Sequence, residues 1–129
     1  MKIKYSYAYS FDKRDNILSV RLYNTLHLKN AIAILRELLL YIRRYPTCGI
    51  LMDCRKVDYA DNISAVNTFS TFLNEYYTGI SNHKIIFISG SPKQVVFATL
   101  FKHILGVKGE NMQICSTEEY AKSYLSLNQ

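Results

Sequence analysis

Polar and apolar side chains alternate along the start of the chain, which is typical of a half-buried strand. From Lys2 to Phe11 one face carries Lys, Ser and Ala, whereas the other carries Ile3, three tyrosines and Phe11. A polar turn occupies residues 12–16, and apolar residues resume from Ile17 to Leu22. These two segments predict an antiparallel hairpin.

The next segment changes to the helical period. Its apolar side chains recur every three or four residues between Leu28 and Tyr45, at Leu28, Ala31, Ile32, Leu35, Leu38, Leu39 and Ile42. Pro46 ends this predicted helix, and Asn24 or Thr25 is expected to cap its start.

Three short apolar runs later in the chain predict buried strands, at Gly49–Met52, Lys84–Ile88 and Met112–Cys115. Each run is followed by residues that favour a helix start. The first helix has Asp61 or Asn62 as its cap and runs to about Tyr77. The other two begin with capping boxes, Ser91-Pro-Lys-Gln94 and Ser116-Thr-Glu-Glu119, and the former helix continues to Leu105.

The resulting order is β-β-α-β-α-β-α-β-α, which fits a single domain over all 129 residues. Strands joined by crossover helices pair in parallel, so we expect an α/β fold with a mostly parallel sheet and an N-terminal antiparallel hairpin. Ligands of open α/β sheets bind beyond the carboxyl ends of the strands. The segment from Asp53, at the end of the third strand, to the helix start at Asp61 is therefore the expected site.

This element order and the residues of that loop resemble the STAS domain, in particular its SpoIIAA-like branch. The resemblance covers nearly the whole chain, including Lys84–Pro92 and Ser116–Leu125. In anti-sigma-factor antagonists of this family the loop reads Asp-x-x-x-x-Asp-Phe-hydrophobic-Asp-Ser-Ser-Gly, with a phosphorylated serine at the helix start. The resemblance implies a regulatory, protein-binding role for the domain.

The loop of this chain matches the acidic part of that pattern and departs from its serines. Asp53 and the run Asp58-Tyr59-Ala60-Asp61 fit without a gap. Asn62 follows, Ile63 stands at the phosphoacceptor position, and Ser64 replaces the glycine. The resemblance therefore implies that the serine phosphoswitch is missing. Ser64 is either a displaced phosphorylation site or an ordinary small polar residue of a first helical turn.

Charge, apolar runs and cysteine count argue against several classes of protein. The net charge is +6, but the Lys and Arg residues are dispersed and form only pairs, so nucleic-acid binding is not favoured. The longest uncharged apolar stretch, Leu38–Ile42, is too short for a transmembrane segment, and the N-terminus lacks a signal-peptide pattern. A cytoplasmic location is therefore expected. The odd cysteine count, at Cys48, Cys54 and Cys115, and the lack of a CxxC pair predict free thiols.

Candidate catalytic and metal-binding residues are present, but they do not form a recognisable motif. A nucleophile, base and orienting acid could come from Ser64, Ser89 or Ser91, from His83 or His103, and from Asp53, but no nucleophile-elbow motif accompanies them. Asp53, Asp58 and Asp61 could bind a divalent cation, although Arg55 and Lys56 offer these acids partners. We expect His27, His83 and His103 at the surface or at helix caps. No cofactor or metal site is predicted.

The sequence therefore favours a non-enzymatic STAS-like regulatory or protein-interaction domain, which could form a homodimer through an edge strand or helix face. Its expected binding surface comprises Asp53, Asp58, Tyr59, Asp61, Asn62, Ile63 and Ser64. The alternative is a carrier of a lipid or other lipophilic small molecule, because the SpoIIAA-like branch resembles Sec14-type lipid-binding domains. Tyr5, Tyr7 and Tyr9 share one strand face, which either lines a lipophilic pocket or packs beneath a helix. An enzyme ranks third and a nucleic-acid-binding protein fourth.

Overall fold

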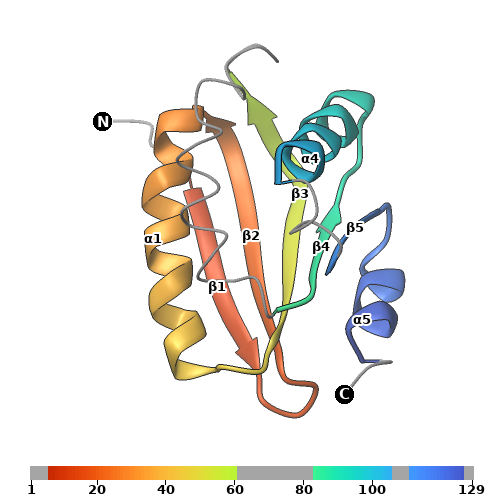
Figure 1. The fold of residues 1–129 in the computed structure, drawn as a ribbon. Helices are drawn as coiled ribbons and strands as arrows, with labels where there is room; N and C mark the ends of the chain where they lie inside the picture. Colours follow the sequence, from red (N-terminus) through yellow and green to blue (C-terminus); the bar gives the residue numbers. More distant parts are fainter. Residues whose placement is uncertain (1–5, 61–82, 106–110, 127–129) are drawn as a thin grey trace.

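A computed structural model describes residues 6–60, 83–105 and 111–126. Its five-stranded sheet has the order β1-β2-β3-β4-β5, in which β1 and β2 are antiparallel and the remaining neighbours are parallel (Figure 1). The elements are β1 Ser6–Asp12, β2 Ile17–Leu26, α1 Leu28–Arg44, β3 Gly49–Tyr59, β4 Ile85–Ile88, α4 Pro92–Leu105, β5 Met112–Cys115 and α5 Glu118–Ser126. The predicted mixed α/β sheet with its N-terminal hairpin is confirmed. The helix predicted after Asp61 lies outside the described residues.

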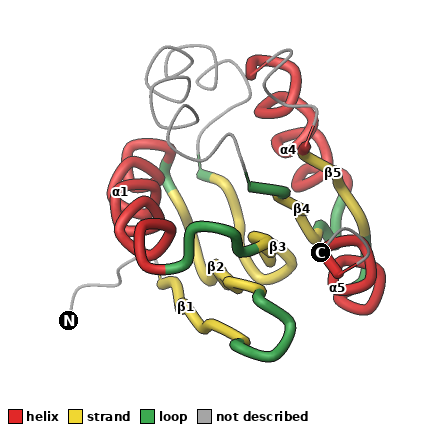
Figure 2. The backbone as a smooth tube through the Cα atoms, turned by 60° about the horizontal axis from the view of Figure 1, so that its bottom comes forward, coloured by secondary structure: helices red, strands yellow, loops and turns green. Residues whose placement is uncertain are grey.

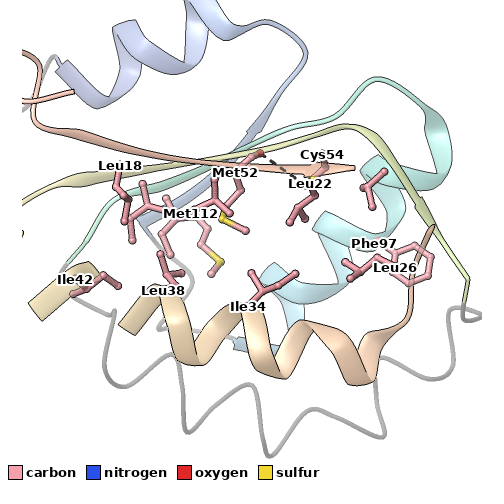
Figure 3. Close-up of a cluster of buried hydrophobic side chains, with 14 of the residues drawn as sticks. Leu18, Leu22, Leu26, Ile34, Leu38, Ile42, Met52, Cys54, Phe97 and Met112 are labelled. Atoms are coloured by element: carbon pink, nitrogen blue, oxygen red, sulfur yellow. Dashed lines mark hydrogen bonds between the residues drawn. The ribbon is translucent and has the colours of Figure 1, made fainter. Parts of the chain in front are cut away.

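The helices lie on the two faces of the sheet (Figure 2), and an apolar layer holds them to each face. On one face, α1 and α4 cover a cluster built from alternate residues of β2 and β3 (Figure 3). On the other face α5 packs Ala121 and Leu125 against Leu51 and Ile86. Because successive residues of a strand point to opposite faces, the central strands are apolar on both sides, as the continuous apolar runs predicted.

Helix α1 faces the sheet with Ile34, Leu38 and Ile42, all of them buried. Leu38 and Ile42 belong to the predicted stripe, whereas Ile34 does not, and Leu35 and Leu39 are half-buried at its side. Cations in the last turn of α1 favour the negative end of the helix dipole.

The predicted cap of α1 is wrong. Strand β2 continues to Leu26, so Asn24 and Thr25 are strand residues that pair with Val57 and Asp58 of β3, and Asn24 has a left-handed φ of 64°. The N-cap position falls to His27, an exposed residue whose side chain makes no capping hydrogen bond. The sheet register, rather than a local capping preference, sets where this helix begins.

The tyrosines of β1 pack beneath α1. The Tyr7 hydroxyl donates to the Glu37 carboxylate, and the Tyr9 ring stacks on Tyr41 with a centroid distance of 4.5 Å. Both rings border the core under α1. Of the two interpretations left open, packing beneath a helix is confirmed for Tyr7 and Tyr9, whereas Tyr5 lies outside the described residues.

The capping box at the start of α4 is confirmed. The main-chain N–H of Gln94 donates to Ser91 Oγ at 3.2 Å. In return, the side-chain oxygen Oε1 of Gln94 accepts from the main-chain N–H of Gly90 at 2.6 Å. The returning bond therefore reaches one residue earlier than in the usual box.

At α5 the predicted cap is displaced by one residue. Thr117 Oγ1, not Ser116, accepts from the main-chain N–H of Tyr120 at 3.2 Å, and the helix begins at Glu118. This placement directs Glu118 toward Arg21 of β2, an ion pair that local sequence does not reveal.

Candidate functional site

The third strand is longer than its apolar run indicates. β3 extends to Tyr59, so the prediction of a loop from Asp53 onward is wrong. Beyond Asp53 the strand continues because β2 is also longer and pairs with it as far as Leu26 opposite Tyr59. β4 ends at Ile88, opposite Asp53. Asp53 is thus in the middle of β3 but level with the carboxyl end of β4.

A β-bulge in β3 lies directly after Asp53. Arg21 pairs with Asp53 and Tyr23 with Lys56, so β3 has one more residue than β2 in this interval. The bulge leaves Arg55 and Lys56 exposed in succession and returns Val57 to the core. Bulges of this kind redirect side chains and are frequent beside functional sites.

Asp53 is the centre of an ion-pair network. Its carboxylate accepts from Arg21 Nη1 at 2.7 Å and from Arg55 Nε and Nη2 at 2.9 and 2.8 Å. Arg55 also donates its main-chain N–H at 3.2 Å. Arg21 Nη2 bridges onward to Glu118 Oε1 of α5 at 2.5 Å. We call these residues, Arg21, Asp53, Arg55 and Glu118, the Asp53 cluster.

The charges of the Asp53 cluster keep its acids ionised. Burial alone would raise the pKa of Asp53, but the hydrogen bonds from Arg55 and the charges of Arg55 and Arg21 outweigh it, and the pKa is lowered. The hydrogen bond from Arg21 lowers the pKa of Glu118, and the same bond raises the pKa of Arg21. With four donors on one buried carboxylate, Asp53 is poorly suited to act as a base or metal ligand.

Sequence reasoning anticipated Arg55 as a partner of the acids and missed Arg21 and Glu118. These two contacts span 32 and 97 residues. One signal was present, because Arg21 is a cation within an apolar strand, where a long-range acidic partner is expected.

The next two residues of the expected surface point in different directions. The Asp58 side chain is 72% exposed, with Lys93 Nζ at 3.4 Å, and Lys93 also donates to the Tyr59 carbonyl oxygen at 2.6 Å. The Tyr59 ring is buried and stacks on Phe97 with a centroid distance of 4.4 Å, and burial raises its pKa well above the usual value. Only Asp58 of this pair offers its side chain to a partner. The remaining predicted residues lie outside the part of the chain that the structure describes: Asp61, Asn62, Ile63 and Ser64.

Two exposed apolar residues lie on α4 shortly after Lys93, the residue that contacts Asp58. Val95 and Val96 are 41% and 39% exposed, while the opposite side of the helix is buried. Val96 lies one helical turn after Lys93, the residue that contacts Asp58. We call these residues, Asp58, Lys93, Val95 and Val96, the β3–α4 surface. Sequence reasoning missed its α4 part, although the apolar residues on both sides of this helix were a visible signal.

Among the described residues, the structure keeps the candidate serine and histidine side chains apart, and Ser64 lies outside this part of the chain. His83 is buried, contrary to the expected surface or cap position, and its Nδ1 lies 2.7 Å from the Cys48 carbonyl oxygen. Ser89, also buried, follows the other end of β4, so the four residues of that strand, roughly 13 Å, lie between it and His83. Its Oγ has no partner among the described residues. Ser91 and His103 are roughly 18 Å apart along α4.

The acidic residues considered for a cation are also separated. Asp53 and Asp58 lie five residues apart on an extended strand, roughly 15 Å. In residues 6–60, 83–105 and 111–126, no group of three His, Cys, Asp or Glu is placed to hold a metal ion. Asp61 is outside these ranges.

All three cysteines are free thiols, as predicted. Burial raises the pKa of Cys48 to about 11 and that of Cys54 to about 12. Cys115 is half-buried, and burial raises its pKa as well. Thiols in these surroundings are poor nucleophiles near neutral pH. None of the helices that the structure describes has the length and apolar character needed to cross a membrane.

The mixed sheet, with a hairpin followed by parallel strands and crossover helices, defines a SpoIIAA-like fold. The same fold is found in the crystal structure of an uncharacterised DUF3478-family protein from Shewanella loihica PV-4, described as having a SpoIIAA-like fold. The two chains are 12% identical, with a TM-score of 0.64 over 97% of this chain and 98% of that one. No family model matches the chain, and no curated protein matches it. The predicted fold resemblance is confirmed.

Proposed function

We propose that this chain is a non-enzymatic, cytoplasmic STAS-like regulatory domain that binds a protein partner through the β3–α4 surface. The observation that supports this most is the exposed pair Val95 and Val96 beside the ion pair of Asp58 and Lys93. Apolar side chains rimmed by charged residues are typical of protein interfaces. In the sequence, the predicted site residues Asp61, Asn62, Ile63 and Ser64 follow Ala60 directly.

The Asp53 cluster supports an interaction role over a catalytic one. A general base needs a free lone pair and a pKa near the working pH. The carboxylate of Asp53 is occupied by Arg21 and Arg55, and its pKa is lowered. In our proposal the cluster fixes α5 and the bulged strand, and thereby holds the adjoining binding surface in one conformation.

The hollow that described residues form on α1 does not favour the carrier alternative. Pockets for lipids and drug-sized ligands are mainly apolar and measure about 300–1,000 Å³. A hollow on the outer flank of α1 measures about 210 Å³, and the described residues that line it include charged Glu37 and Arg44. A lipid retained by the purified protein in native mass spectrometry would count against our proposal.

Affinity capture followed by binding measurement on the captured partner tests the proposal. We expect Val96→Lys to weaken binding at least tenfold, since a charge would replace an apolar contact of the β3–α4 surface. Asp58→Lys should also weaken it. The matched control is Tyr120→Lys, which replaces another exposed apolar residue by lysine, on α5.

Loss of binding in Val96→Lys with retention in Tyr120→Lys is the supporting result. Equal binding by wild type and all three variants would refute the proposed surface. Circular dichroism of each variant checks that the fold is retained.

A further inference from the structure

Helix α1 carries a stripe of exposed and half-buried residues on the flank that faces the edge strand β1 (Figure 1). Glu37, Leu40, Tyr41 and Arg44 follow one another at intervals of three, one and three residues, which places them on one side of the helix. Leu40 is 62% exposed. All four residues border the hollow of about 210 Å³.

The hollow is large enough to receive an aliphatic side chain. A cavity of roughly 150 Å³ accommodates benzene, which is larger than the end of a leucine side chain. Two of the side chains that line the hollow are already held in place: Tyr41 is stacked on Tyr9, and Glu37 accepts a hydrogen bond from the hydroxyl of Tyr7. Arg44 makes no ion pair with any residue that the structure describes.

The charges of this stripe are symmetric about its centre. Glu37 precedes Leu40 by three residues, and Arg44 follows Tyr41 by three. A second α1 laid antiparallel, with a two-fold axis between Leu40 and Tyr41, would place each Glu37 opposite Arg44 of the other copy. A surface that complements itself in this way is what an isologous dimer requires. A parallel arrangement would instead oppose like charges.

We propose that two copies of this chain associate through antiparallel packing of their α1 helices. Each Leu40 enters the hollow beside Tyr41 of the other copy, and two Glu37–Arg44 ion pairs flank this contact and set the direction of the helices. The inference is independent of the β3–α4 surface, because that surface is built from a different helix and strand. Failure of either proposal leaves the other standing.

Sedimentation velocity of the full chain over a range of concentrations tests the dimer. We expect the wild-type mass to rise with concentration from 15.0 kDa toward twice that value. Leu40→Lys should raise the dissociation constant at least tenfold. Arg14→Glu, a charge reversal at an exposed position of the β1–β2 turn, is the control for Arg44→Glu and should leave dimerisation unchanged.

A charge-exchange experiment tests the antiparallel arrangement itself. Glu37→Lys and Arg44→Glu should each weaken the homodimer, since each variant opposes like charges across the interface. Mixed in equal amounts, the two variants should form a heterodimer, because the introduced lysine then faces the introduced glutamate and the native Arg44 faces the native Glu37.

Three results would overturn the proposal: a wild-type chain that stays monomeric, a dimer unaffected by Leu40→Lys, or a mixture of the two folded charge variants that stays monomeric. Thermal unfolding followed by circular dichroism establishes that each variant is folded. If Glu37→Lys disturbs the fold through its contact with Tyr7, the pair Leu40→Lys and Arg44→Glu still decides whether this stripe forms the interface.

Discussion

Replacing Asp53 by Asn should destabilise the fold, because it removes the anion on which Arg21 and Arg55 converge. Breaking one partner of a buried ion pair costs about 3–5 kcal/mol. The two arginine side chains are 34% and 37% exposed, so solvent screens part of this loss and about 2–3 kcal/mol should remain. For a domain of this size the melting temperature should fall by roughly 6–12 °C. Urea and thermal unfolding followed by circular dichroism measure both quantities.

The matched control is Asp58→Asn, the same chemical change on the same strand. Asp58 is exposed and has one contact, at 3.4 Å, with Lys93. Its loss should change the free energy of unfolding by less than about 0.5 kcal/mol. Equal effects of Asp53→Asn and Asp58→Asn would refute the inference that the Asp53 cluster holds this part of the sheet together.

The effect of Asp53→Asn should also depend on pH with a definite sign. The pKa of Asp53 is lowered in the folded state, where the Arg55 and Arg21 interactions outweigh burial. Such a group stabilises the fold above its unfolded pKa of about 3.9, and this contribution is lost as the pH falls through the folded value. The stability gap between wild type and Asp53→Asn should therefore hold between about pH 5 and about pH 7 and narrow below about pH 4. A gap that widens in acid contradicts the ion-pair explanation.

Three further predictions concern packing, hydrogen bonding and thiol chemistry. In Gly49→Ala the new Cβ would lie 3.0–3.3 Å from the Leu125 side chain, so urea unfolding should show a loss of about 1–3 kcal/mol. The double variant with Leu125→Ala should lose less than the sum of the two single losses, because the shortened side chain no longer clashes. An additive double variant would speak against this clash. Gln94→Leu removes the side-chain hydrogen bonds to the Gly90 N–H at 2.6 Å and the Val57 carbonyl oxygen at 2.8 Å, and should lower the free energy of unfolding by about 2–3 kcal/mol. A loss below about 0.5 kcal/mol would show that these two hydrogen bonds do not stabilise the fold. A thiol reagent near neutral pH should modify Cys115 first, and the two buried thiols only as fast as the protein opens; three equal rates would contradict the burial seen here.

The sequence predicted most of the fold where the signal is local. The apolar runs at Lys84–Ile88 and Met112–Cys115 fall within one residue of β4 and β5. In β4 the reason is that a strand covered on both faces needs a continuous apolar segment. The alternation of Tyr7 and Tyr9 identified the face of β1 that packs against the core. The cap of α4 was also predicted from local sequence, and Ser91 supplies it.

The sequence could not predict the second half of β3. Residues from Arg55 to Asp58 are mostly polar and favour a loop on local grounds, yet pairing with β2 keeps them extended. The candidate site had the same limitation. Arg21 and Glu118 reach Asp53 and its neighbourhood only through the tertiary fold, and the burial of His83 depends on packing beside Cys48.

A photo-cross-linking amino acid placed at Val96 tests the proposed interaction most directly. In cells, the β3–α4 surface predicts one dominant cross-linked protein from Val96, no such product from the same probe at the exposed Tyr120, and loss of the Val96 product when Asp58→Lys is added. No product at Val96, or the same products from both positions, would contradict the proposal that this domain works by binding a protein at the start of α4.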